Sequence, residues 1–88
     1  MFRITDNKGF QITLDNGYMV SVQFGPGNYS SNYSLNMLAN MDKPQTALTA
    51  ETALIDPEGR FVEYKGDSVQ GHQTVNDVLE LLAYANSL

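Results

Sequence analysis

Cysteine and tryptophan are absent from this 88-residue chain, which also has a single histidine. The absence of cysteine excludes disulfide bonds, thiolate metal sites and a cysteine nucleophile. No apolar run approaches the roughly 18 residues of a membrane-spanning helix, and the first residues lack the apolar core of a signal peptide. These absences predict a soluble protein of the cytoplasm that makes no contact with a membrane.

Basic residues are also scarce, and this excludes a class of partner. Five Lys and Arg stand against ten Asp and Glu, which gives a net charge of −5. Binding to duplex nucleic acid needs clustered basic residues, whereas here they are scattered along the chain. Direct binding to duplex nucleic acid is therefore not expected. The acidic residues form no block and indicate an ordinary solvated surface.

The sequence contains no motif typical of catalysis. His72 is the one histidine and lacks the neighbouring ligands that a zinc site requires. No spacing forces two carboxylates together for hydrolysis, and no nucleophile-elbow or P-loop sequence occurs. We therefore expect a protein that is not an enzyme and that needs no metal or cofactor.

Two turns organise the first part of the chain. If Asp15–Gly17 is a three-residue loop with its glycine in the left-handed conformation, Ile12 pairs with Val20. The same reasoning at Asn7–Gly9 pairs Ile4 with Ile12. The predicted result is a three-stranded antiparallel meander with one apolar face. That inner face consists of Phe2, Ile4, Phe10, Ile12, Leu14, Tyr18, Val20 and Val22.

The second half of the chain predicts a hairpin followed by a helix. Strand patterns at Ala50–Ile55 and Arg60–Tyr64 flank Asp56–Gly59, which has the residues of a type I turn. Thr74 is placed to cap a C-terminal helix, with Asp77 in its first turn. An apolar stripe with the helical period should cover the inner face of the sheet. It consists of Val75, Val78, Leu79 and Leu82, with Ala85 or Asn86 next, and Leu81 widens it. The predicted fold class is α+β, a single domain (residues 1–88) in which a meander and hairpins of about five strands pack against one helix.

The segment from Gly25 to Asn36 departs from both patterns, because it consists almost entirely of Gly, Asn, Ser and Tyr. Tyrosine offers rigid contact area, and the small polar residues offer adaptable hydrogen bonds. We predict that this segment is the binding site, with Tyr29 and Tyr33 as anchors. Its backbone amides and hydrogen-bonding side chains would come from Gly25, Gly27, Asn28 and Asn32. The alternative surface is the outer sheet face around Gln11, Thr13, Met19 and Ser21.

The run Gly17–Tyr29, together with Gly9–Leu14 before it, resembles small proteins encoded by tailed phages and prophages. The similarity continues in Ala50–Ile55, in the Asp-Pro-Glu-Gly turn and in Val69–Gly71, but no catalytic motif is attached to it. The resemblance implies a phage accessory protein that binds a host protein in the host cytoplasm and inhibits a bacterial defence system. A sponge for a signalling nucleotide and a phage structural or assembly module are the alternatives. Homo-oligomerisation is left open.

Overall fold

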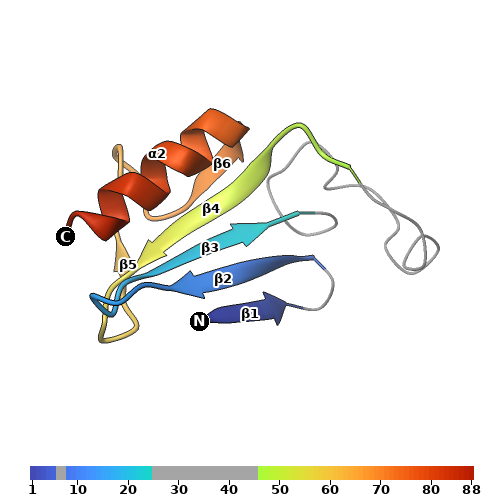
Figure 1. Cartoon of the computed structure of the whole chain (residues 1–88). Coiled ribbons are helices and arrows are strands. Elements are labelled where there is room, and N and C mark those ends of the chain that lie inside the picture. The colour runs from blue at the N-terminus through green and yellow to red at the C-terminus, as the bar shows by residue number, and fades with distance from the viewer. Residues whose placement is uncertain (6–7, 25–45) are drawn as a thin grey trace.

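The computed structural model describes residues 1–5, 8–24 and 46–88, which form one antiparallel sheet and one helix (Figure 1). The strands run in the order β1-β2-β3-β4-β5, and β6 shares with β5 the second edge of β4. Their bounds are Phe2–Thr5 (β1), Gly9–Thr13 (β2), Met19–Gln23 (β3), Ala50–Ile55 (β4), Phe61–Val62 (β5) and Gln70–Gln73 (β6), and α2 spans Val75–Asn86. The predicted α+β fold is confirmed.

The predicted register between β2 and β3 is also confirmed. Ile12 lies opposite Val20, and the Leu14 N–H donates to the Tyr18 carbonyl at 2.8 Å. Gly17 has a φ of +88°, the left-handed conformation that the three-residue loop requires.

The predicted register between β1 and β2 is wrong by two residues. Phe2 lies opposite Ile12 and Ile4 opposite Phe10. Gly9 was predicted to belong to the loop, but it is the first residue of β2, where a Cβ atom would clash with the carbonyl oxygen of Val22. The glycine is therefore needed for close backbone approach and not for the turn. Because side chains alternate with a period of two, the apolar residues of β1 stay on the predicted face.

The hairpin after β4 has the predicted turn. The Gly59 N–H donates to the Asp56 carbonyl at 2.9 Å, and Gly59 has a φ of +84°. The strand that follows is shorter than predicted, since only Phe61–Val62 pair with β4. The sixth strand, β6, was not predicted as a strand at all.

The helix begins as predicted. The Asp77 N–H donates to the Thr74 hydroxyl at 3.2 Å, and the Thr74 N–H donates to the Asp77 carboxylate at 2.9 Å. This reciprocal pair is a capping box. The core lies between helix and sheet and consists of Val20, Val22, Ala50, Leu54, Leu81 and Ala85.

The prediction that the helix covers the inner face holds for only part of the sheet. Helix α2 packs against β3, β4 and β6, and Figure 1 shows β1 at the far edge from it. A helix is about 10 Å wide and strands are about 4.8 Å apart, so one helix covers two or three strands. Strands β1 and β2 extend beyond the area that the helix covers. Within the described ranges, no helix is long and apolar enough to cross a membrane.

Candidate functional site

The six residues predicted to bind, Gly25, Gly27, Asn28, Tyr29, Asn32 and Tyr33, lie outside the described residues. The structure does place the described residues on either side of the longer range 25–45, which contains them. Phe24 directly follows β3, and Thr46 stands a few residues before β4. Gln23 pairs with Glu51, so the segment leaves and rejoins the sheet at the same end.

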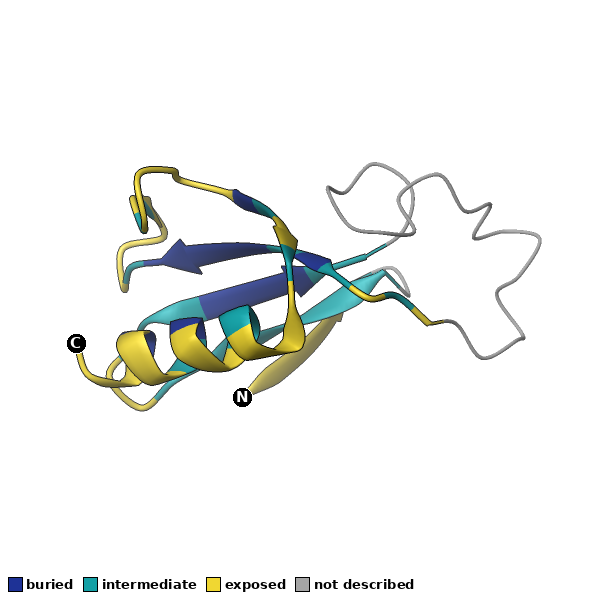
Figure 2. Cartoon of the chain, turned by 90° about the horizontal axis from the view of Figure 1, so that it is seen from above, coloured by how far each residue is buried: buried dark blue, intermediate teal, exposed yellow. Residues whose placement is uncertain are grey.

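Burial falls steadily from β4 to β1 along the inner face. In one cross-strand row, Leu54 and Val20 are fully buried, Ile12 is half-buried and Phe2 is 74% exposed. Figure 2 shows the same gradient, from buried central strands to an exposed β1. A single exposed apolar side chain is common on protein surfaces, so Phe2 is informative only together with exposed apolar neighbours.

A second cross-strand row repeats the gradient. Val22 is buried on β3, Phe10 is half-buried on β2, and Ile4 is 79% exposed on β1. Together the two rows leave an apolar area on β1 and β2 that the helix does not fully cover. We call it the open face and define it as Phe2, Ile4, Phe10 and Ile12.

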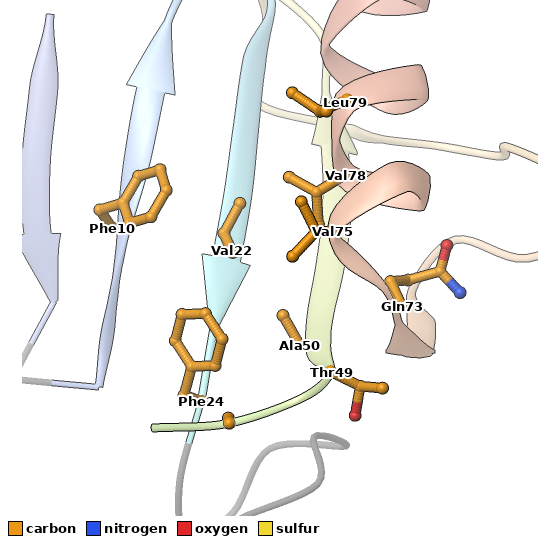
Figure 3. A pocket seen from close by; sticks show the side chains of 10 residues that line it. Phe10, Val22, Phe24, Thr49, Ala50, Gln73, Val75, Val78 and Leu79 are labelled. Carbon is orange, nitrogen blue, oxygen red and sulfur yellow. The ribbon is translucent and has the colours of Figure 1, made fainter. Parts of the chain in front are cut away.

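A cavity of about 210 Å³ lies where the open face meets the helix. In Figure 3, Val75, Val78 and Leu79 point from α2 toward the sheet, facing Phe10 and Phe24, whereas Gln73 points away. We call this cavity the apolar pocket. Its lining is Phe10, Val22, Phe24, Ala47, Thr49, Ala50, Gln73, Val75, Val78 and Leu79.

The pocket is chemically suited to an apolar group. Its described lining contains two polar residues, Thr49 and Gln73, and neither a basic nor an acidic one. A dry cavity of about 150 Å³ is enough to hold benzene, so this pocket has room for a larger side chain or ring. Val75 and Leu79 are 71% and 57% exposed, so the helix wall of the pocket is open to solvent.

Sequence reasoning assigned Val75 and Leu79 to the buried stripe of the helix, and this interpretation is wrong for both. The helix turns only Leu81 and Ala85 fully into the core. A signal was nevertheless present, because an apolar stripe over Val75, Val78, Leu79, Leu81 and Leu82 is wider than one sheet-facing side of a helix needs.

The alternative surface on the outer face is only partly accessible. A cavity of about 380 Å³ lies there, lined by Met1, Phe2, Arg3, Gln11, Thr13 and Met19. Ser21 is buried, and its hydroxyl accepts from the Gln23 amide at 3.3 Å. Gln23 also accepts from the Thr5 hydroxyl at 2.9 Å. These side chains hold one another across the strands and so have less capacity for a ligand.

Two carboxylates of the described part stabilise local structure. The Thr74 backbone N–H, and then its hydroxyl, hold the pKa of Asp77 below its ordinary value of 3.8. In the hairpin turn, a hydrogen bond from the Arg60 backbone N–H lowers the pKa of Asp56. His72 is exposed in β6, with a φ of +53° at a bulge opposite β4. No group of His, Asp and Glu able to hold a metal ion occurs in the described ranges.

Comparisons with protein-family models, with curated proteins and with solved structures found no match. The function is therefore argued from the apolar pocket and the open face.

Proposed function

We propose that this protein is a non-enzymatic binding module that holds an apolar segment of another protein in the apolar pocket and across the open face. One observation supports the proposal above all others: the helix covers only part of an apolar sheet face. Phe2 and Ile4 on β1, and Val75 and Leu79 on α2, are each more than half exposed. Phe10 connects the two pairs, because it lies opposite Ile4 and lines the apolar pocket with Val75 and Leu79. Exposed apolar areas bordered in this way are typical of protein-binding surfaces.

The chemistry of the pocket favours a protein segment over a nucleotide. A phosphate group is bound by basic side chains or by a cluster of backbone amides. The described lining of the apolar pocket has no Lys or Arg. An aromatic or aliphatic side chain of a partner would instead gain from burial there, by about 25 cal/mol for each Å² of apolar area removed from water.

The nature of the partner is proposed from the resemblance to phage and prophage proteins. In this proposal, the partner is a bacterial host protein in the cytoplasm, and binding inhibits a defence system. The net charge of −5 fits a protein partner better than nucleic acid. Residues Gly25, Gly27, Asn28, Tyr29, Asn32 and Tyr33 stay predicted contacts.

Site-specific photo-crosslinking in the bacterial host tests the proposal. A benzophenone amino acid replaces Phe10, which lines the apolar pocket, or Phe61, which is exposed on the opposite sheet face. We expect a discrete protein adduct from position 10 and none from position 61. Equal adducts at both positions, or none at position 10, would overturn the proposal.

A further inference from the structure

We propose that the outer edge of β1 accepts an added antiparallel strand from the partner protein, with the side-chain pattern apolar–acidic–apolar. The inference rests on the proposed function, since it names how the bound segment is held. It makes three demands on β1: free backbone groups, matching apolar side chains and a charge that selects the partner.

The first demand is met by the hydrogen-bond pattern of β1. Met1 and Thr13 exchange two backbone hydrogen bonds, of 3.0 and 2.8 Å. In an antiparallel pair such bonds occur at every second residue, so Arg3 and Thr5 bond inward to β2. The N–H and C=O groups of Phe2 and Ile4 therefore point to the outer edge. Among the described strands, β1 pairs only with β2.

The side chains of the same two residues meet the second demand. Phe2 and Ile4 lie on the open face, and they are 74% and 79% exposed. An added strand that bonds to their backbone places its own apolar side chains directly beside theirs. It would extend both cross-strand rows by one residue and shield Phe2 and Ile4 from water.

Arg3 meets the third demand and distinguishes between candidate strands. It is exposed on the other sheet face and forms no salt bridge within the described part of the chain. An acidic residue opposite Arg3 forms a favourable cross-strand pair. A second copy of this chain, paired through Phe2 and Ile4, would set Arg3 opposite Arg3 and bring together two molecules of net charge −5. A foreign acidic strand is therefore favoured over self-association.

Amide hydrogen exchange of the free protein tests whether the outer edge of β1 is unpaired. We expect protection of the Arg3 and Thr5 amides and fast exchange at Phe2 and Ile4. Protection of Phe2 and Ile4 that grows with protein concentration would show that a second copy occupies the edge. Protection that is independent of concentration would show that another part of the same chain occupies the edge. Either result would overturn the inference.

Peptide titration followed by NMR tests the partner chemistry. The probes are acetyl-Thr-Val-Glu-Val-Thr-amide and the same peptide with Lys in place of Glu. We expect shifts at Phe2 and Ile4 and about fivefold tighter binding of the Glu peptide. Arg3→Glu should reverse the preference, a result that loss of folding cannot imitate. Equal affinity for both peptides, or an unchanged preference in Arg3→Glu, would contradict the inference.

Two variants at position 4 test whether binding uses the backbone N–H on the outer edge of β1. Ile4→Pro removes an N–H that β2 does not use, and proline is tolerated at sheet edges. It should abolish peptide binding while the melting temperature changes little. Ile4→Val keeps the N–H and an apolar β-branched side chain, so it should bind far more tightly than Ile4→Pro. If Ile4→Pro binds as well as Ile4→Val, no strand is added at β1. Photo-crosslinking at Phe10 could still succeed in that case, so failure of the edge is distinguishable from failure of the proposed function.

Discussion

At the scale of single residues, position along a cross-strand row decides what an apolar side chain contributes. Leu54 and Phe2 stand at opposite ends of one row, yet Leu54 is fully buried and Phe2 is largely exposed. The binary pattern of the sequence marks both as inner-face residues and cannot distinguish them. The difference arises from which strands α2 covers, and this depends on tertiary packing.

Truncation along the inner face should therefore have graded effects on stability. Leu54→Ala leaves a cavity in the core and should lower the free energy of unfolding by about 2–5 kcal/mol. Ile12→Ala should cost less, because Ile12 is half-buried, and Ile4→Ala should stay within about 0.5 kcal/mol. Urea unfolding curves of the three variants provide the measurement. Equal losses at Ile4 and Leu54 would show that β1 is covered.

A buried glutamine joins the end of the sheet to its neighbouring turn. The Gln70 amide donates to the carbonyls of Asp67 at 2.6 Å and Tyr64 at 3.0 Å, and its oxygen accepts from the Thr52 hydroxyl at 3.4 Å. Gln70→Ala leaves these groups without their partner and should cost about 1–3 kcal/mol. Gln73→Ala is the matched control, since the Gln73 side-chain amide donates to the carbonyl of nearby Gly71 at 3.0 Å, and its loss should cost much less in the same urea curves.

At the scale of elements, the sequence predicts what local chemistry determines. The Gly17 bulge aligned β2 with β3, and the Thr74 cap marked the start of α2. The β1–β2 register was missed because Gly9 has two possible roles, and only the neighbouring strand β3 decides between them. β6 was missed because its sequence, Gln-Gly-His-Gln, has no apolar alternation and contains a bulge.

The helix cap should make stability depend on pH. The pKa of Asp77 is lower in the folded state than its ordinary value of 3.8. Its stabilisation is therefore present above that value and is lost as the pH falls through the folded pKa. Asp77→Asn keeps an oxygen acceptor but does not titrate. Below about pH 4, the urea midpoint of Asp77→Asn should fall less steeply with pH than that of the original chain. Asp56 is present in both proteins, so its contribution to the pH dependence is the same in each. Parallel pH profiles would contradict this role for Asp77.

At the scale of the whole molecule, one short helix on a wide sheet leaves part of the apolar face exposed among the described residues. The sequence predicted the layers but placed recognition in Gly25–Asn36, which lies outside the described residues. It could not reveal the open face, because exposure depends on which strands the helix reaches. Phe24, the described residue directly before that predicted segment, lines the apolar pocket.

The most direct measurement is quantitative capture of the partner from host lysate by immobilised variants. Val75→Glu with Leu79→Lys replaces the exposed helix wall of the pocket by an i,i+4 ion pair that supports the helix and leaves the net charge unchanged. Phe61→Glu is the control on the opposite face. The account predicts at least a tenfold loss of the captured protein with the double variant, an unchanged melting temperature and full capture by Phe61→Glu. Undiminished capture by a folded Val75→Glu, Leu79→Lys variant would contradict it.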